Sequence, residues 1–381
     1  MLKDLKVLEL ASVLAGPGVG QFFAELGAEV IKVENTRMGG DVTRSWKGAG
    51  EQTDDRSAYF CSVNWGKKSV ALDFNLEADR KVIHHLVRDI DIVIASYKPG
   101  DAEKLQVDYK TLSAINPKLI YGQITGYGSD NPRVGYDAVI QAEAGFMSMN
   151  GEPGRSSIKI PVALMDVLAG HHLKEAILLA LLNRERTGKG DCVEVSLIQS
   201  AISSLANQAT NWLVAGKVPK KQGSAHPNIA PYGDVFQTKD QKELLLAIGS
   251  DRQFQDLCRL LGIDALSKDE KFRINSSRVE NRLELNSILQ SRIGEFTSDE
   301  LMTRINSLKI PAGIIQNVQQ ALELQEAKEL IIEKDGMKGV LNFVGKAKYS
   351  WKSPDVAAKS FLTPSHLGEH TELYTSLKKS R

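Results

Sequence analysis

The chain contains 381 residues, of which 42% are hydrophobic and 25% are charged, so it has the composition of a globular protein and the length for two domains. Lysine and arginine (48) balance aspartate and glutamate (47), and the net charge of +1 gives no electrostatic reason to expect nucleic acid or an anionic membrane as the main partner. The three cysteines are far apart, which favours a reducing compartment without a disulfide framework. The N-terminus lacks a signal-peptide pattern and no stretch is as apolar as a membrane span, so we predict a cytoplasmic protein.

Short apolar runs alternate with helical patterns in the first half of the chain. This alternation predicts an α/β fold with a mostly parallel, doubly wound sheet. Ligands of such sheets bind at the carboxyl ends of the strands, where we expect the loops 12–17, 35–44, 96–100 and 125–128. The expected strands are 6–10, 28–34, 69–74, 91–95, 118–125 and 191–197, and the expected helices include 76–87, 136–147 and 198–213.

The first of these units is a strand, a glycine-rich turn, a helix and a second strand that ends at Glu34. This pattern suggests a dinucleotide site, but Gly16, Gly18 and Gly20 do not have the G-x-G-x-x-G spacing. A phosphate group could still bind the free N–H groups at the start of the helix. Alternatively, the glycines serve only the close packing of strand and helix. The local pattern leaves both interpretations open.

The pattern changes after residue 216. Lys217–Pro231 is rich in lysine, proline and glycine, which is typical of a linker. The following residues predict a smaller second domain, with a strand at 242–248 and amphipathic helices at 252–261, 278–295 and 298–308. A strand or connector at 310–314, a helix at 318–328 and extended structure from 341 onward complete the expected elements.

Asp166 lies among apolar residues, with Val162–Met165 before it and Val167–Ala169 after it. The helical period continues from there to Gly188, so Asp166 is expected near the start of a long, mostly buried helix; the periodic residues are Leu173, Ile177, Leu178, Leu181 and Leu182. Two interpretations follow. Asp166 is either a helix N-cap, which the local sequence alone favours because caps are common, or a carboxylate that desolvation makes reactive.

Several other chemistries are not supported. The sequence contains no G-x-S-x-G, H-E-x-x-H or G-x-x-x-x-G-K-[ST] motif. The histidine pairs at 84–85 and 171–172 are adjacent residues that point in different directions on a helix, so no metal site is predicted. Four lysines near the expected strand ends favour an anionic ligand instead: Lys67, Lys68, Lys98 and Lys104.

An ordered series of segments resembles the family III CoA-transferases, the group of formyl-CoA transferase, carnitine CoA-transferase and succinate–hydroxymethylglutarate CoA-transferase. The series runs from about Leu5 to Thr371 and comprises VLELASVLAGPGVGQFFAELGAEVIKVE, GGDVTR, NWGKKSVALDF, SYKPG, ITGYG, the Asp166 segment with RERTGKG, AHPNIAPYG, IPAGI and HLGEHT. No single motif is specific, whereas their order is. The match is nearest to the succinyl-CoA-dependent dicarboxylate branch.

The resemblance implies a fold and an assembly. Residues 1–216 and 319–381 would form a large, Rossmann-like, CoA-binding domain, and residues 217–318 would form the linker and a small α+β domain. Two chains would be threaded through each other as an interlocked homodimer.

The resemblance also implies that Asp166 is the catalytic nucleophile. CoA and acyl-CoA would bind as substrates, with no tightly bound cofactor. Departures from formyl-CoA transferase at Leu14, Asn35 and Gly223–Gly233 put its formyl and oxalyl substrates in doubt. The positions that match CoA contacts of the family are Val13, Leu14, Ala15, Asn64, Lys67, Lys68, Leu72, Ser96, Tyr97, Lys98, Lys104 and Tyr127.

The implied reaction begins with attack of the Asp166 carboxylate on an acyl-CoA thioester, which gives a mixed anhydride and CoA thiolate. A dicarboxylate acceptor would need a cation, for which Arg44 and Arg133 are candidates. One alternative is an α-methylacyl-CoA racemase, but the histidine of its G-H-D sequence is replaced here by Tyr136, a poor base at neutral pH. Another alternative is a catalytically idle protein that binds CoA or a nucleotide.

Overall fold

The computed structural model describes residues 2–346 and 361–376, and the chain divides into two compact units. The first unit contains Met1–Phe146, Lys159–Ala215 and Lys328–Arg381, and the second contains Met147–Ile158 and Gly216–Ala327. Both ends of the chain therefore belong to the first unit. The second unit includes 147–158, which the sequence pattern did not assign to it.

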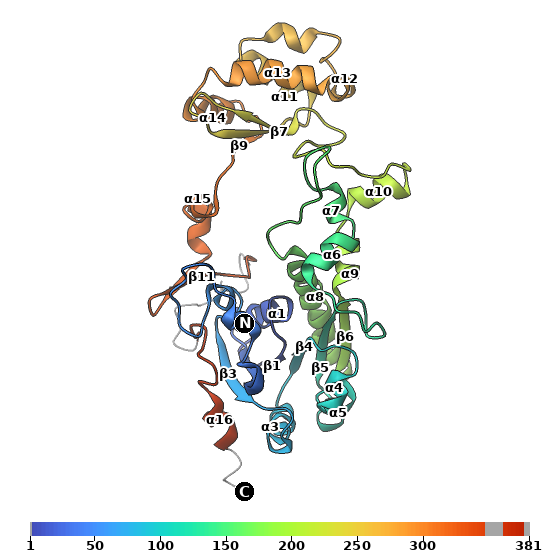
Figure 1. Ribbon diagram of the computed structural model, residues 1–381, viewed down its shortest axis with the longest axis vertical. Coiled ribbons are helices and arrows are strands. Elements are labelled where there is room, and N and C mark those ends of the chain that lie inside the picture. Colours follow the sequence, from blue (N-terminus) through green and yellow to red (C-terminus); the bar gives the residue numbers. More distant parts are fainter. Residues whose placement is uncertain (1, 347–360, 377–381) are drawn as a thin grey trace. The chain divides into compact units, whose positions relative to one another are not determined.

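The first unit is built on a six-stranded sheet in the order β3-β2-β1-β4-β5-β6, in which every neighbouring pair is parallel (Figure 1). This is the strand order of a Rossmann fold, so the expected parallel α/β architecture is confirmed. The strands are β1 (Lys6–Leu10), β2 (Glu29–Asn35), β3 (Lys67–Leu72), β4 (Ile92–Ala95), β5 (Ile120–Thr125) and β6 (Asp191–Ser196).

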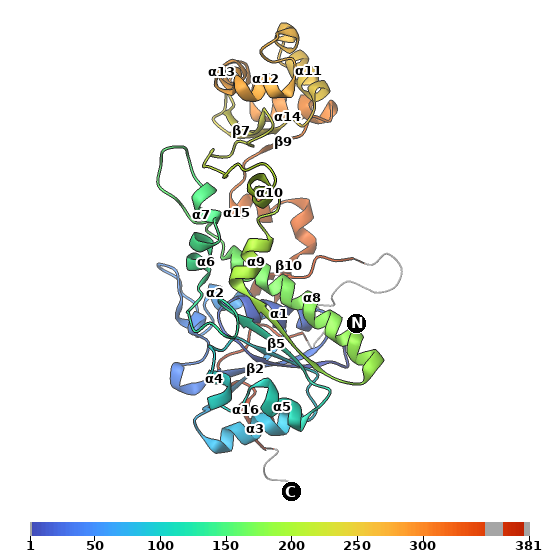
Figure 2. The same cartoon turned by 90° about the vertical axis from the view of Figure 1, so that its right-hand side faces the viewer.

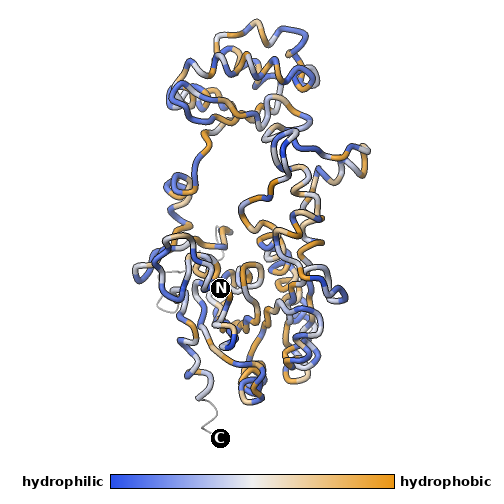
Figure 3. The backbone as a smooth tube through the Cα atoms, in the orientation of Figure 1, coloured by the Kyte–Doolittle hydropathy of each residue, from blue (hydrophilic) through white to orange (hydrophobic). Residues whose placement is uncertain are grey.

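Helices cover both faces of this sheet (Figure 2). α1 (Ala15–Glu25) and α8 (Leu164–Thr187) pack on one face, and α3 (Glu77–Val87) and α5 (Tyr109–Ile115) pack on the other. The central strand β4 is apolar throughout (Figure 3) because its side chains alternate between the two cores, with Ile92 and Ile94 on one side and Val93 and Ala95 on the other. A parallel strand buried on both faces is therefore a continuous apolar run.

The other elements of the first unit are short. They are α2 (Ala58–Cys61), α4 (Asp101–Lys104), α6 (Asp137–Glu143), α9 (Leu197–Ser203), α10 (Asn207–Leu213), α16 (Thr371–Thr375), the 3-10 turns η1 (Thr36–Met38) and η2 (Val42–Ser45), and the strands β10 (Ile331–Lys334) and β11 (Met337–Val340). α7 (Phe146–Met149) lies at the boundary between the units. No helix in the described part of the chain is long and apolar enough to cross a membrane.

The second unit contains a three-stranded antiparallel sheet and helices that pack on it. Its strands, in the order β7-β8-β9, are β7 (Tyr232–Gln237), β8 (Glu243–Ala247) and β9 (Ala312–Ile314). Its helices are α11 (Asp251–Leu260), η3 (Asp264–Lys268), α12 (Asn275–Glu280), α13 (Arg282–Ile293), α14 (Ser298–Ser307) and α15 (Val318–Leu322), and η4 (Gln325–Glu329) follows at its end. The apolar faces of α11, α13 and α14 form one core with β8.

Four helices that the period predicts as continuous are interrupted. The expected helix at 318–328 divides after Leu322 into α15 and η4. The expected helix at 136–147 divides into α6 and α7 near Gly145, which has a φ of 89°. The expected helix at 198–213 divides at Ala206 (φ 48°), and that at 278–295 divides at Asn281. Apolar residues continue across each interruption, so periodicity alone does not reveal a break.

The sequence pattern missed strand β7 and the β10–β11 hairpin. The hairpin turn is Asp335-Gly336, and both residues have positive φ, 49° and 76°. Asp-Gly is the sequence signal of such a turn. The strands on either side are only four residues long, which made the alternation too short to detect. The expected extended tail lies partly outside the described residues, at 347–360 and 377–381.

β3 begins at Lys67, two residues before its expected start. Lys67 and Lys68 therefore lie at the amino end of the strand, at the opposite edge of the sheet from the loops that bind ligands. The C-terminal segment covers this outer strand. Ser365 Oγ donates to the Lys67 carbonyl (2.7 Å), and His370 N donates to the Ser69 carbonyl (2.9 Å). Covering the edge in this way prevents strand addition from another chain.

Candidate active site

A cavity of about 300 Å³ opens at the carboxyl ends of β1, β4 and β5. This is the point where the strand order reverses between β1 and β4, the usual ligand position in a doubly wound sheet. The loop after β1, the loop after β4 and the start of α8 all reach it. Its lining is Ser12–Gly16, Ser96–Pro99, Ile124–Gly126, Asn131, Arg133–Asp137, Asp166 and Leu197.

Asp166 is the third residue of α8, and its side chain is 9% exposed. The local sequence favoured an N-cap at this position, and that interpretation is wrong. Ala163 is the N-cap residue and has no side-chain cap. Within the described residues no hydrogen bond reaches the Asp166 carboxylate, which faces the cavity lining instead of the helix backbone.

The capping role at α8 belongs to Asp137, from the first turn of α6. Its Oδ1 accepts a hydrogen bond from Met165 N (2.8 Å), and its Oδ2 accepts one from Gln141 Nε2 (2.7 Å). Gln141 is fully buried and also binds Ile160 N through its Oε1 (2.8 Å). This network holds the start of α8 and places the Asp137 carboxylate beside the cavity.

The surroundings of Asp166 make it more basic than an ordinary aspartate. Burial, and to a lesser degree repulsion from the Asp137 carboxylate, raise the pKa of the Asp166 carboxyl to about 7. The helix dipole of α8 favours the ionised form, but desolvation outweighs it here. A carboxylate with a raised pKa in a cavity is a typical functional group.

The loop after β1 brings the start of α1 to the same cavity. Val13 has a φ of 75°, and Leu14, the N-cap residue of α1, has no side-chain cap. α1 and α8 approach closely because residue 170 is glycine: a Cβ there would lie 3.2 Å from the Ala15 carbonyl oxygen. Ala15 and Gly16, the first two residues of α1, line the cavity, and the N–H groups at a helix start have no acceptor within the helix, so they can bind an anionic atom there.

The cavity lining includes six of the twelve residues predicted to contact CoA, together with Asp166. These six are Val13, Leu14, Ala15, Ser96, Tyr97 and Lys98. Tyr127 lies next to the lining residue Gly126. Its hydroxyl donates to Glu143 (2.9 Å), and its ring stacks on the Arg133 guanidinium at 4.2 Å.

The other five predicted contacts lie elsewhere in the first unit. Lys67 is 2% exposed, and its Nζ contacts Glu9 (2.7 Å), the Pro17 carbonyl (2.8 Å) and Asn64 Oδ1 (2.9 Å); burial lowers its pKa to about 8. Leu72 belongs to the core on the α3 side. Lys68 pairs with Glu29, and Lys104 pairs with Asp101.

The two arginine candidates for a carboxylate site differ in the structure. Arg44 is 5% exposed, and its guanidinium already pairs with Glu34 and Asp55 and donates to the Ser365 carbonyl. Arg133 lines the cavity and is about half exposed. Its Nη2 pairs with Glu143, whereas within the described residues no hydrogen bond uses its Nε or Nη1. Arg133 is therefore able to accept a second anion, and Arg44 is not.

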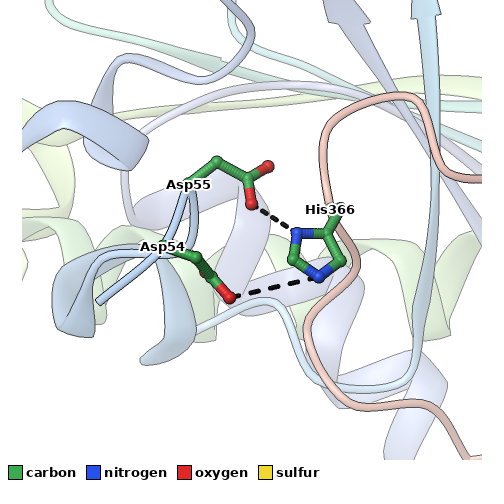
Figure 4. Close-up of side chains that lie close together, drawn as sticks. All are labelled: Asp54, Asp55 and His366. Atoms are coloured by element: carbon green, nitrogen blue, oxygen red, sulfur yellow. Dashed lines mark hydrogen bonds and ion pairs between the residues drawn. The ribbon is translucent and has the colours of Figure 1, made fainter. Parts of the chain in front are cut away.

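Three potential metal ligands lie together outside this cavity. Asp54, Asp55 and His366 are exposed, and their ligand atoms lie within 4.8 Å of one another (Figure 4). Both carboxylates already pair with guanidinium groups, Asp54 with Arg56 and Asp55 with Arg44. The cluster therefore acts as an ion-pair network that joins the C-terminal segment to the loop before α2.

Comparison with known proteins identifies the family of the chain. The family model described as CoA-transferase family III matches residues 2–371. A succinate–glutarate CoA-transferase of Agrobacterium fabrum is 39% identical over 84% of this chain and 81% of its own length. The succinyl-CoA:glutarate CoA-transferase of Homo sapiens is 33% identical over 97% of this chain and 84% of its own length.

A crystal structure of a CAIB/BAIF family protein from Brucella suis has the same fold. It matches with a TM-score of 0.87 and 39% identity, and the match covers 99% of this chain and 98% of that chain. The resemblance inferred from the ordered motifs is thus confirmed. The chain belongs to CoA-transferase family III and is an enzyme of the CoA-transferase class.

Proposed function

We propose that this CoA-transferase moves CoA from an acyl-CoA thioester, such as succinyl-CoA, to a dicarboxylic acid through covalent intermediates at Asp166. The observation that carries this proposal is the unbonded Asp166 carboxylate, with its raised pKa, at the wall of the cavity between β1 and β4. A carboxylate without hydrogen-bond donors keeps its lone pairs available for attack. The start of α1 supplies N–H groups for the oxyanion that forms.

The reaction then balances in four steps. An Asp166 oxygen attacks the thioester carbonyl and the C–S bond breaks. This releases CoA thiolate and forms a mixed anhydride between Asp166 and the donor acyl group. The thiolate attacks the aspartyl carbonyl, which releases the donor acid and leaves an aspartyl-CoA thioester. The acceptor carboxylate attacks this thioester, the C–S bond breaks, and a second anhydride forms as CoA thiolate is released. CoA thiolate finally attacks the acceptor acyl carbon, which gives the new acyl-CoA and restores the Asp166 carboxylate.

CoA is proposed to lie along the loops after β1 and β4. Val13–Ala15 and Ser96–Lys98 line the cavity on these two loops, and Lys98 is an exposed cation among them. The relatives support a dicarboxylate, because their names give succinate, glutarate, citramalate or mesaconate as substrates.

The racemase alternative requires a second acid–base group opposite Asp166. Tyr136 stands at the position of the racemase histidine, lines the cavity and is 61% exposed. An exposed tyrosine does not act as a base at neutral pH. An idle CoA-binding protein would have no reason to keep an unbonded carboxylate at the cavity wall, because burial of that group without a partner costs free energy.

A panel of acyl-CoA donors and carboxylic acids tests the proposal directly. Succinyl-CoA with glutarate or another dicarboxylate should give a new CoA ester, detected by mass spectrometry, and free succinate in equal amount. Acetyl-CoA and propionate serve as the control pair, because neither acid has a second carboxylate and any transfer would give a CoA ester of different mass. CoA binding without exchange by any pair would support the idle alternative, and exchange of an α-proton with solvent would support the racemase.

Asp137→Asn should extend the activity to lower pH. The ionised Asp166 is the nucleophile, so activity is lost as pH falls through its pKa of about 7. Removal of the Asp137 charge lowers that pKa, while the asparagine oxygen can still accept the Met165 N–H bond. The measurement is the exchange rate between about pH 5 and pH 9. The ratio of the rate at pH 6 to that at pH 8 should rise.

Asp130→Asn is the control for this experiment, because it removes a carboxylate from the exposed loop between β5 and α6. Its pH profile should match the wild type. A profile of Asp137→Asn that is unchanged, or that moves to higher pH, would show that Asp137 does not act on the charge of Asp166.

The interlocked homodimer expected from the family is the proposed assembly. α8 is apolar on several sides and exposes Leu179 (67%) and Leu182 (58%), although such helices are normally buried. A partner chain would cover this face. Sedimentation equilibrium should give a dimer at every concentration at which the fold persists. A folded monomer that appears on dilution would contradict interlocking.

A further inference from the structure

Val13 has a backbone conformation that its side chain disfavours. Its φ of 75° lies in the left-handed region, where a β-branched residue is strained and glycine is not. Val13 lines the cavity of Asp166, two residues before α1 begins. Strain of this kind persists only where the surrounding structure imposes it, so the contacts of this loop identify what imposes it.

One buried ion pair holds the loop on both sides of Ser12. The two carboxylate oxygens of Asp41 each accept a hydrogen bond from Val13 N, at 3.3 Å. Lys32 Nζ donates to the Ala11 carbonyl at 2.9 Å and pairs with Asp41 Oδ2 at 2.8 Å. Lys32 is 1% exposed and Asp41 is 3% exposed. We call Lys32 and Asp41 the loop clamp.

The loop clamp is itself held from three directions. Lys32 pairs with Glu9 Oε1 of β1 (3.0 Å), and Asp41 Oδ1 accepts hydrogen bonds from Thr43 N (3.0 Å) and Thr43 Oγ1 (2.8 Å). The Asp41 backbone N–H donates to Glu34 Oε2 (2.9 Å). Arg44 holds Glu34 through two bonds of 2.7 Å each. These contacts leave the clamp little freedom to move.

Stability alone does not explain this arrangement. A buried ion pair loses much of its Coulomb attraction to desolvation, so it is weak evidence for a stabilising role. Glycine at position 13 would adopt the same φ without strain. The clamp and the strained valine nevertheless occur together, at the entry to the helix whose first turn reaches the cavity.

We propose that Lys32 and Asp41 are positioning residues, which hold Val13 in the left-handed conformation so that the first-turn N–H groups of α1 point into the cavity beside Asp166, where the oxyanion forms. This proposal rests on the proposed function of Asp166. Without the clamp, Val13 relaxes to a negative φ, the peptide before Leu14 rotates, and the start of α1 moves away from the reacting carbonyl.

Asp41→Asn tests the proposal with little change in volume. Asparagine has one acceptor oxygen in place of two and turns N–H groups toward Lys32 or Val13. We expect kcat for acyl exchange to fall by about 100-fold, because a displacement of about 1 Å has that effect on a catalytic group. The loss should appear mainly in kcat and less in the KM for acyl-CoA, since the CoA contacts on the β4 loop are untouched and only those on the β1 loop shift.

Val13→Gly provides the rescue. In the Val13→Gly protein the left-handed conformation no longer needs the clamp, so adding Asp41→Asn should lower kcat by less than about fivefold. Asp91→Asn is the matched control, because Asp91 pairs with Arg184 at the amino edge of the same sheet (3.1 Å). Its kcat should stay within about twofold of the wild type. An equal loss of kcat from Asp41→Asn in both backgrounds would overturn the proposal.

Hydrogen exchange gives a readout that does not depend on activity. The Val13 amide should exchange at least about tenfold faster in Asp41→Asn than in the wild type, while amides in β4 remain protected. If the wild-type protein transferred CoA between no donor and acceptor, the proposed function would be refuted. The hydrogen-exchange measurement would still test the clamp. An unchanged Val13 amide, or a kcat that stays within twofold in active Asp41→Asn, would refute the clamp.

Discussion

Replacing Asp166 with asparagine is expected to lower the rate of CoA exchange by about 10⁴-fold or more, the usual size of the effect when a nucleophile is removed. The amide oxygen is a far weaker nucleophile than a carboxylate and cannot form the mixed anhydride. The fold should persist, because the Asp166 side chain has no hydrogen-bond partner in the described structure and Asp137 caps the helix. CoA affinity, measured by calorimetry, should remain near that of the wild type.

Covalent trapping separates this explanation from a general defect. Wild-type protein incubated with succinyl-CoA and then hydroxylamine should carry a hydroxamate on the peptide that contains Asp166, detected by mass spectrometry. Asp166→Asn should carry none. Asp166→Ala repeats the measurement with a side chain that cannot deamidate to aspartate. Substantial exchange by both variants, or an adduct found only on another peptide, would refute the assignment.

Replacing Arg133 with methionine is expected to remove the preference for dicarboxylates. The Arg133 guanidinium is the proposed partner of the second carboxylate, because it lines the cavity and its Nε and Nη1 are unused in the described structure. Loss of a charge-assisted pair of this kind should lower kcat/KM for a dicarboxylate acceptor by about 10²–10³-fold. For a monocarboxylate of equal length the loss should be below about fivefold.

Two controls make the Arg133 result specific. Arg133→Lys keeps the charge but loses the planar fork, so it should retain part of the preference. Arg186→Met removes an exposed arginine at the far end of α8 and should change neither acceptor. The measurement is the ratio of kcat/KM for glutarate to that for pentanoate. Equal losses for both acids would mean that Arg133 supports the loop and does not bind the carboxylate.

Local sequence was enough to identify the elements that are long, strongly periodic or uniformly apolar. The run at 91–95 becomes β4, and the period after Asp166 becomes α8, because burial on both faces or along one stripe leaves a direct pattern in the residues. The order of the motifs identified the family, and it predicted the position of the nucleophile. Short elements such as β10 and β11 were missed because four residues give too little alternation to recognise.

The surroundings of the site could not be predicted from local sequence, because they depend on contacts between segments that are distant in the chain. Asp137 reaches the start of α8 from 28 residues away, and Asp41 reaches Val13 across the same separation. Lys67 looked like a surface cation for an anionic ligand, yet the strand register turns it toward Glu9 in the interior. The sequence gives the charge of a side chain, but the packing of remote elements sets its solvation and its partner. Only the tertiary structure therefore decided that Asp137 caps α8 and that Asp166 lines the cavity without a hydrogen bond in the described residues.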